Sequence, residues 1–540
     1  MINKDILDQL KLRTFFSYFN ENPKSYDPEQ SIQGERYFDS VKNSKFNEID
    51  YKSTSYQGGE FSPFLNSSIN IQYPTKEIEN YISDANSSRL GWVNKSIDER
   101  ITILQESLEA VSKRFFDIAF ATMHTTGQSF LMSFQASGPH AADRALETLA
   151  VAQQELTRYN TNAEWNKDFG KFVLTINKDF IAIGKGIGLV IGCSTFPTWN
   201  SVTGIYANLV CGNPVIVKPH PKAILPIALY IAEIRKTLKA NGIDENLIQL
   251  AVDTIEDPIA KEFIERDEIK LIDYTGGNAF GDYVESRLDK TVFTEKAGVN
   301  CCIIDSVENI ESVYANIAFS LTLYSGQMCT APQNIFVSER GVNTTDGIVS
   351  YEDFCDGLAN AITNLVENPR AGAGTAGAIQ NPDTLKRIEE FSAGRVILKS
   401  RPIENAEFTE AVTASPMLIA LTSVDKPVFS NECFGPIGFI IKTKDIDESL
   451  GLASELAGKK GAITCLAYST NDEMVKKIRI QMNNAFVPVS FNFTGAGFVN
   501  QHAAFSDFHV TGGNPAGNAT FTNADYINRR FVWLGNRYMG

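Results

Sequence analysis

Residues 270–281 read Lys-Leu-Ile-Asp-Tyr-Thr-Gly-Gly-Asn-Ala-Phe-Gly, an apolar run followed by two adjacent glycines and the start of an amphipathic segment. This order predicts a strand that passes directly into a helix. Adjacent glycines let the backbone approach a ligand closely, and the first turn of a helix offers unpaired N–H groups to a phosphate. The same pattern is also typical of an ordinary strand-to-helix turn, so this stretch alone leaves ligand binding open.

The alternation of short apolar runs and amphipathic segments continues on both sides of this turn. Strands separated by helices form right-handed βαβ units on a parallel sheet. We therefore expect an α/β protein whose ligands bind at the carboxyl ends of the strands. The predicted strands cover 189–193, 215–217, 247–252, 270–274 and 301–304, and the predicted helices cover 199–209, 225–240, 258–266 and 279–288.

The N-terminal third of the chain is less regular. Residues 1–85 are rich in Ser, Asn, Tyr and Gly without a sustained period, which predicts an irregular N-terminal extension. A helix is predicted over 139–157. Alternation of apolar and polar residues within 170–188 predicts a β-hairpin arm, with its turn at 177–179 where the alternation is interrupted.

Composition excludes several classes of protein. The 540 residues include 43% hydrophobic and 21% charged residues, the balance of a folded protein with two to four domains of roughly 100–200 residues each. The formal net charge of −15 disfavours nucleic acid and anionic membranes as partners. No apolar stretch approaches the ~20 residues of a membrane span, and no secretory signal is visible, so we expect a cytoplasmic protein.

The eight cysteines and five histidines are scattered without a C-x-x-C pair, so neither a metal site nor a disulfide framework is expected. Cys329 differs from the others because it ends the tight loop Gly326-Gln327-Met328-Cys329 after an amphipathic helix. A thiol in such a loop is a nucleophile where its thiolate is favoured, although most such cysteines are inert.

Three charged residues stand where a ligand-binding edge is expected. Lys218 ends a predicted strand before a proline-rich loop, which suits an anionic partner such as a ribose phosphate. Glu295 precedes the expected fifth strand and is a candidate general base, and Glu432 lies in the tight loop 431–436. Each position also suits an ordinary surface lysine or a structural carboxylate.

The order and spacing of these segments together resemble the aldehyde dehydrogenase superfamily, from about residue 90 to about residue 500. The N-terminal extension and residues 193–200 look like a narrower group within it, the enzymes of phenylacetic acid degradation. The segments that carry the wider resemblance are, in order, Phe196-Pro197, Lys218, Gly276-Gly277, Glu295, Cys329 and 431–436.

The resemblance implies NAD(P)-dependent oxidation of an aldehyde to a carboxylic acid through a thiohemiacetal and a thioester. In this scheme Cys329 corresponds to the nucleophile and Glu295 to the general base that activates water. The substrate it implies is a small aldehyde, such as a semialdehyde of aromatic catabolism. The implied coenzyme-binding residues are Lys218, Thr275, Gly276, Gly277, Glu432 and Phe434.

The resemblance also implies a division into domains and an assembly. A hairpin arm of this kind serves oligomerisation in the superfamily, so a homodimer or a dimer-based oligomer is expected. The implied parts are an N-terminal extension (1–85), a Rossmann-type coenzyme domain (86–168 and 189–297), an arm with a C-terminal tail (169–188 and 515–540) and an α/β catalytic domain (298–514).

Two positions depart from the superfamily pattern. Thr195 stands where the family usually has an asparagine whose amide stabilises the oxyanion, and its hydroxyl is a shorter, single donor. Pro221 stands where NAD-specific relatives often have a glutamate for the ribose 2′-OH. Without that carboxylate, Lys218 and His220 are expected to accept the 2′-phosphate of NADP, with NAD as the alternative. His220 also suits a solvent-exposed loop.

Two other functions stay open at this point. The same fold can pass the acyl group to CoA instead of water, although Glu295 argues against this because transfer to CoA needs no base for water. A catalytically silent nucleotide-binding homologue is the second alternative, and Thr195 is its only support.

Overall fold

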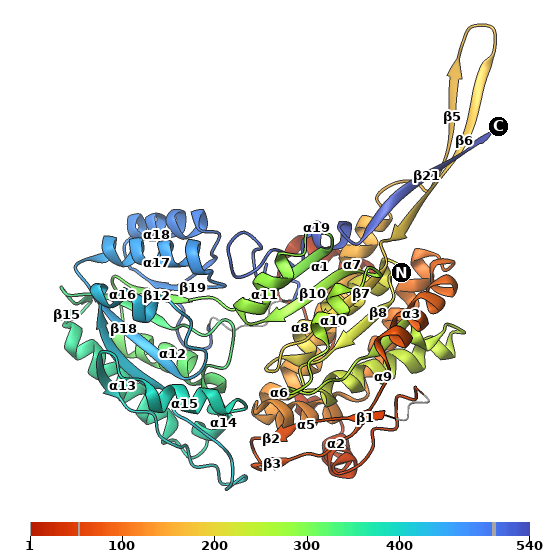
Figure 1. Ribbon diagram of the computed structural model, residues 1–540. Helices are drawn as coiled ribbons and strands as arrows, with labels where there is room; N and C mark the ends of the chain where they lie inside the picture. The colour runs from red at the N-terminus through yellow and green to blue at the C-terminus, as the bar shows by residue number, and fades with distance from the viewer. Residues whose placement is uncertain (1, 52–54, 499–503) are drawn as a thin grey trace.

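The computed structural model describes residues 2–51, 55–498 and 504–540. Two mostly parallel sheets, each flanked by helices, lie side by side, and a long arm projects from one of them (Figure 1). The expected α/β class is therefore confirmed. Within the described ranges, no helix is both long enough and apolar enough to cross a bilayer.

Five parallel strands form the first sheet, in the spatial order β11-β10-β7-β8-β9. The chain order reverses between β7 and β10, and α/β sheets bind ligands at such a point. The strands are β7 (Ile187–Ile191), β8 (Val215–Lys218), β9 (Ile248–Leu250), β10 (Ile269–Gly276) and β11 (Thr291–Lys296), and the helices between them are α8 (Pro197–Val210), α9 (Leu225–Ala240), α10 (Ala260–Glu265) and α11 (Asn278–Glu285).

The strand predicted over 301–304 is confirmed as β12, and it lies in the second sheet. The fifth place in the first sheet is taken by β11, which the sequence analysis does not predict. The sequence does not reveal β11 because Thr294, Glu295 and Lys296 have the polarity of a loop. A distant segment buries them: the backbone N–H of Lys296 donates to the carbonyl of Ala516 at 2.6 Å.

The second sheet contains seven strands in the order β16-β17-β18-β13-β12-β19-β20, with the β16–β17 pair antiparallel and the other pairs parallel. Its strands are β12 (Cys301–Ile304), β13 (Asn334–Ser338), β16 (Arg395–Leu398), β17 (Met417–Thr422), β18 (Ile437–Thr443), β19 (Cys465–Tyr468) and β20 (Val489–Phe491), and its longest helices are α12 (Ile310–Thr322), α13 (Tyr351–Val366), α17 (Ile446–Lys460) and α18 (Asp472–Asn484).

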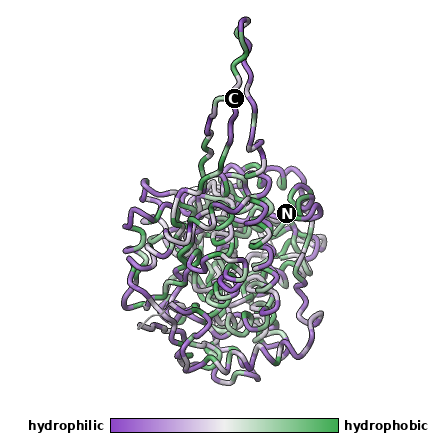
Figure 2. Tube along the Cα trace, turned by 90° about the vertical axis from the view of Figure 1, so that its right-hand side faces the viewer, coloured by the Kyte–Doolittle hydropathy of each residue, from purple (hydrophilic) through white to green (hydrophobic). Residues whose placement is uncertain are grey.

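The arm is a three-stranded antiparallel sheet that stands away from the body (Figures 1 and 2). Its strands are β5 (Asn162–Asp168), β6 (Val173–Gly184) and, from the end of the chain, β21 (Phe531–Met539). The predicted turn at 177–179 is wrong, because these residues lie inside β6 and pair with both neighbours. The turn is at 169–172, where Gly170 has a φ of +80°.

The N-terminal extension is more regular than the sequence predicts. It contains α1 (Lys4–Leu12) and α2 (Pro28–Val41), and α3 (Ile78–Val93) begins within it. The side chains of Asn3 and Asp27 cap α1 and α2, but the helices are short and their apolar periodicity is weak. They are stabilised by packing: α1 lies on α7 (Pro139–Leu156), the helix predicted over 139–157, and α2 lies on α5 (Phe115–Thr126).

A buried ion pair joins Arg530, directly before β21, to Asp273 on β10 of the first sheet. Arg530 Nη1 and Nη2 donate to the Asp273 carboxylate at 2.8 and 2.5 Å. Tyr526 and Asn208 also donate to this carboxylate, at 2.8 and 2.9 Å. A buried charge needs such full pairing, so the pair fixes the start of β21 against the sheet.

Candidate active site

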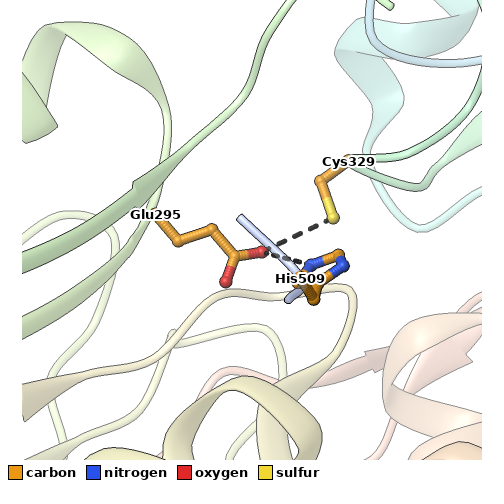
Figure 3. A group of neighbouring side chains, drawn as sticks. All are labelled: Glu295, Cys329 and His509. Atoms are coloured by element: carbon orange, nitrogen blue, oxygen red, sulfur yellow. Dashed lines mark hydrogen bonds and ion pairs between the residues drawn. The ribbon is translucent and has the colours of Figure 1, made fainter. Parts of the chain in front are cut away.

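Three side chains from distant segments meet between the two sheets: Glu295 on β11, Cys329 in a loop after α12, and His509 in the C-terminal segment (Figure 3). The Cys329 thiol lies 3.6 Å from Glu295 Oε1, and His509 Nε2 lies 3.3 Å from the same oxygen. The side chain of Glu295 is only 1% exposed. Among the described residues, no other three His, Cys, Asp or Glu side chains bring a ring nitrogen, a sulfur or a carboxylate oxygen so close to one another.

Strained backbone places Cys329 at this point. The chain leaves α12 through Tyr324, Ser325 and Gly326, all in the left-handed region with φ of +50°, +49° and +63°. A Cβ on residue 326 would lie 2.4 Å from the carbonyl oxygen of Gly435, so the cysteine loop packs directly against the loop 431–436. Left-handed non-glycine residues are costly and concentrate at functional sites. The Ser325 hydroxyl offsets part of the cost by donating its one hydrogen between two carbonyl oxygens within reach, those of Ala376 and Ala414.

The charges around this loop favour an ionised carboxylate beside a protonated thiol. Burial, and then the negative charge of Glu295, hold the pKa of the Cys329 thiol well above its usual value. Burial raises the pKa of Glu295, but the hydrogen bond from His509, the charge on His509 and Arg144 outweigh burial and lower it. A carboxylate within hydrogen-bond range of a thiol can accept the thiol proton.

Cys329 and His509 lie on the wall of a cavity of about 590 Å³. Aromatic and apolar side chains make up much of this wall, including Trp199, Phe319 and Phe508. Among the described residues that line the cavity there is no Lys or Arg. A chamber of this size beside a thiol can hold a small organic substrate.

The predicted oxyanion residue Thr195 is not among the residues that line this cavity, but Asn200 is. The Thr195 carbonyl accepts a hydrogen bond from Gln128 at 2.7 Å, which fixes the turn before α8. Asn200 Oδ1 accepts from the Cys193 thiol at 3.6 Å, and its Nδ2 is buried with no hydrogen-bond partner among the described residues. An unsatisfied buried donor at a reaction chamber is a candidate for stabilising an oxyanion.

The glycine turn lies beside Glu295. In the β10–β11 register Thr275 is opposite Glu295 and Gly276 is opposite Lys296. Gly277 is the N-cap of α11, no side chain caps that helix, and a Cβ on Gly277 would meet open space. These features fit the phosphate groups of a dinucleotide.

Lys218 and His220 occupy the carboxyl end of β8, where Lys218 is buried and His220 is half-buried. Lys218 is 6% exposed, and its Nζ lies 2.7 Å from Asp253 Oδ2. Burial, with the charges of Lys218 and Lys222, lowers the pKa of His220 to about 3, so this ring is neutral at physiological pH.

Glu432 and Phe434 lie in the loop that packs on the cysteine loop. Burial raises the pKa of Glu432 to about 7, against the opposing charge of Arg387. Arg387 also donates to the Phe434 carbonyl at 2.5 Å and so fixes this loop. The structure therefore brings Glu432 and Phe434 near the thiol, and keeps Lys218 and His220 at a separate edge of the first sheet.

Three residues that the sequence analysis does not identify belong to these sites: His509, Asn200 and Asp253. His509 is 214 positions from Glu295, so no local pattern connects them. Asn200 follows Phe196-Pro197 by one helical turn, a spacing that could have signalled it. Asp253 directly follows a predicted strand, the position where ligand-binding side chains are expected.

Comparison with known proteins is consistent with this geometry. The model of the aldehyde dehydrogenase family matches residues 68–496, and the chain belongs to that family. The crystal structure of an NAD-dependent aldehyde dehydrogenase from Burkholderia multivorans superposes with a TM-score of 0.97 at 40% identity, covering 99% of this chain and 97% of that one. The chain is thus an oxidoreductase that acts on aldehydes, with NAD or NADP as coenzyme.

More distant relatives share the family or the fold. The aldehyde dehydrogenase LUC3 of a Fusarium species is 22% identical over 422 residues, which cover 76% of this chain and 82% of that protein. A 1-pyrroline-5-carboxylate dehydrogenase mutant from Thermus thermophilus has a TM-score of 0.75 at 15% identity, covering 98% of this chain and 99% of that one, which shows a common fold.

Proposed function

We propose that this chain oxidises an aldehyde to a carboxylic acid, with Cys329 as nucleophile and Glu295 as general base. The observation that supports it most directly is the 3.6 Å contact between the Cys329 thiol and the Glu295 carboxylate, on the wall of a substrate-sized cavity and beside the glycine turn. Neither residue has this combination of contact, burial and access for a purely structural purpose.

In the first half of the reaction, Glu295 accepts the thiol proton and the Cys329 sulfur attacks the aldehyde carbon. A C–S bond forms, and the carbonyl oxygen becomes the oxyanion of a thiohemiacetal. Asn200 Nδ2, which has no other partner within the described residues, supplies the side-chain donor for this oxygen. In this scheme Asn200 takes the role that the resemblance gives to Thr195.

The second half turns the bound intermediate into the product. A coenzyme held by Lys218, the 275–277 turn and Glu432 would supply the acceptor for the hydride that leaves the substrate carbon. Cys329 then holds the acyl group as a thioester, and Glu295 releases the thiol proton to solvent. The ionised carboxylate deprotonates a water that attacks the thioester carbon; the C–S bond breaks, the acid is released and the Cys329 thiolate takes up a proton again. His509 orients the Glu295 carboxylate and favours its ionised form before each proton transfer.

The coenzyme residues of this proposal occupy both sheets. Thr275, Gly276 and Gly277 bind the pyrophosphate, and Lys218 with His220 forms the edge that meets the adenosine ribose. Glu432 binds the nicotinamide ribose and Phe434 braces it. The uncapped α11 N-terminus and the open space before Gly277 support this arrangement.

The substrate of this proposal is an aldehyde of aromatic catabolism, such as a semialdehyde formed in phenylacetate breakdown. The likeness of residues 193–200 and of the N-terminal extension to the phenylacetic acid degradation protein PaaN supports it. The aromatic wall of the cavity is compatible with such a substrate. A panel of aldehydes, with and without free CoA, separates hydrolysis from acyl transfer to CoA.

Two variants test the roles of Cys329 and Glu295. Cys329→Ala is expected to lower kcat by roughly 10⁴-fold or more and to leave coenzyme affinity within a few-fold. Glu295→Gln is expected to slow the burst of reduced coenzyme and to lower sustained turnover still more, measured by stopped-flow absorbance, because neither the thiol nor the water then meets a base.

Cys193→Ala is the matched control, since Cys193 is the neighbouring thiol that contacts Asn200 but not Glu295. Its kcat should fall far less than that of Cys329→Ala. Retained activity in Cys329→Ala, or equal loss in both cysteine variants, contradicts the assignment. A catalytically silent homologue would show no turnover with any aldehyde and no effect of either change.

A further inference from the structure

Beside Lys218, at the part of the proposed coenzyme site that meets the adenosine ribose, lies a carboxylate to which the superfamily pattern gives no role. Asp253 lies three residues beyond β9, and its Oδ2 is 2.7 Å from Lys218 Nζ at the end of β8. The Asp253 side chain is fully buried and that of Lys218 is 8% exposed. The two groups therefore form one buried pair at the carboxyl ends of adjacent strands.

The net charge of this pair is zero. Asp253 Oδ2 also accepts from the backbone N–H of Ile259 at 3.1 Å, and Oδ1 has no partner among the described residues. Burial raises the pKa of Asp253 and lowers that of Lys218, while their mutual attraction opposes both shifts. The pair adds no positive charge whether the proton is on the ammonium or has moved to the carboxylate.

The other basic residues of this loop do not supply the missing charge. His220 is neutral because burial lowers its pKa to about 3. Lys222 keeps a charge that acts on His220, but its Nζ lies 3.0 Å from Asn381 Oδ1 and is attracted by the Asp383 carboxylate. Its ammonium group is therefore held toward the segment after α14 (Gly372–Ala376). A dianionic phosphate needs a cation or a bidentate arginine to compensate for lost water, whereas a ribose hydroxyl does not.

We propose that Asp253 makes the coenzyme site selective for NAD over NADP, by cancelling the charge of Lys218 that would otherwise pair with the 2′-phosphate. The proposal rests on the coenzyme site of the proposed function. It reverses the preference expected from Pro221, because a carboxylate from the neighbouring strand takes the electrostatic place of the glutamate missing at position 221.

The test is direct measurement of coenzyme affinity by titration calorimetry in the absence of aldehyde. The wild-type chain is expected to bind NAD at least about tenfold more tightly than NADP, a difference of ~1.4 kcal/mol. Asp253→Asn keeps the shape of the side chain and leaves Lys218 as a net cation. Its affinity for NADP is expected to rise about tenfold or more, while its affinity for NAD stays within about threefold.

Asp257→Asn is the matched control, because it removes the same charge from an exposed position in the same loop. It should leave the ratio of the two affinities unchanged. Asp253→Ser provides a second variant if the asparagine destabilises the loop, and thermal unfolding shows whether each variant is folded. The gain in NADP affinity should weaken with added salt, since it depends on a charge pair.

Two results overturn this inference while leaving the coenzyme site intact: a wild-type chain that binds NADP as tightly as NAD, and folded Asp253 variants with the wild-type ratio. Failure of either coenzyme to bind overturns the site itself and the inference with it. Loss of aldehyde oxidation in any variant does not enter the result, because binding is measured without substrate.

Discussion

Glu295 faces a thiol on one side and an imidazole on the other, and both contact the same carboxylate oxygen. Two opposing effects set the pKa of this carboxyl. Burial raises it, and His509 with Arg144 lowers it by a larger amount. The guanidinium of Arg144 lies 3.4 Å from the centre of the Trp199 ring, and Trp199 packs edge-on against His509. The ionisation of Glu295 therefore depends on its direct contacts and also on how Arg144, Trp199 and His509 pack against one another.

His509→Ala tests this balance through the pH dependence of kcat/KM. Without His509, burial acts with less opposition and the pKa of Glu295 rises. The ionised carboxylate is the active form, so the loss of activity on acidification should begin at a higher pH in the variant. The ratio of variant to wild-type activity should therefore be lower near about pH 6 than near about pH 8.

His140→Ala is the control for this measurement, because His140 lies on the same cavity wall but pairs with Glu21 at 2.6 Å. Its profile should parallel the wild-type profile. Superimposable profiles for wild type and His509→Ala would show that His509 has no influence on the base.

Asn200→Ala tests the oxyanion donor. Loss of one such donor typically costs roughly 10²-fold in kcat, and coenzyme affinity should not change because Asn200 is at the aldehyde side. Thr195→Val is the comparison, and a much smaller effect is expected because Thr195 does not line the cavity. If the threonine change costs more than the asparagine change, the donor is Thr195.

At the residue scale, the sequence could indicate Cys329 and Glu295 because each has an informative local segment and a place in a known order of motifs. It could not indicate His509, whose role depends on a contact across 214 positions. It also could not show that Lys218 is paired, since Asp253 reaches it only after β8 and β9 lie side by side.

Single elements determine how firmly the nucleophile is held. The turn between α12 and Cys329 packs against the loop 431–436. At Gly326 the two backbones are so close that no side chain fits. Most helices and four strands of the first sheet could be predicted, because their apolar periodicity is local. β11 and the arm turn could not, because contacts with the distant segments 514–518 and 531–539 decide them.

Gly326→Ala is expected to destabilise the fold and to lower kcat. Its φ of +63° is unfavourable for alanine, and the new Cβ would lie 2.4 Å from the Gly435 carbonyl oxygen. The strain alone is about 1 kcal/mol, and the clash must shift the cysteine loop or the loop 431–436. Thermal unfolding and steady-state kinetics measure the two effects.

Gly458→Ala is the matched control, since a Cβ at this exposed position in α17 meets no atom within 4 Å and lies outside the cavity wall. It should keep wild-type kcat and stability. Equal behaviour of the two variants would show that the cysteine loop tolerates displacement.

The molecule as a whole consists of a compact body and an arm that has few contacts with it (Figures 1 and 2). Apolar side chains on the arm are exposed, with Ile181 at 44% and its partner Leu534 at 50%. Exposed apolar surface on a projecting sheet is typical of an assembly interface. The sequence analysis groups the C-terminal tail 515–540 with this arm, but the pairing of β21 with β6 could be seen only in the structure.

Leu534→Asp is therefore expected to reduce the mass of the particle measured by light scattering at micromolar concentration, because a charge in an apolar interface opposes association. Leu288→Asp introduces the same charge at a residue that is 93% exposed on the body, and should leave the mass unchanged. A wild-type chain that is monomeric at this concentration contradicts the expected oligomer.

The bond between Arg530 and Asp273 sets an order of events during synthesis. The ribosome adds Arg530 after a further 257 residues, about 13–50 s after Asp273 at ordinary elongation rates. Through that interval the nascent β10 contains a carboxylate that no guanidinium has yet reached, and burying it alone would be costly. The first sheet is therefore translated early, but the charge at its Asp273 is paired only after the segment that precedes β21 has been synthesised.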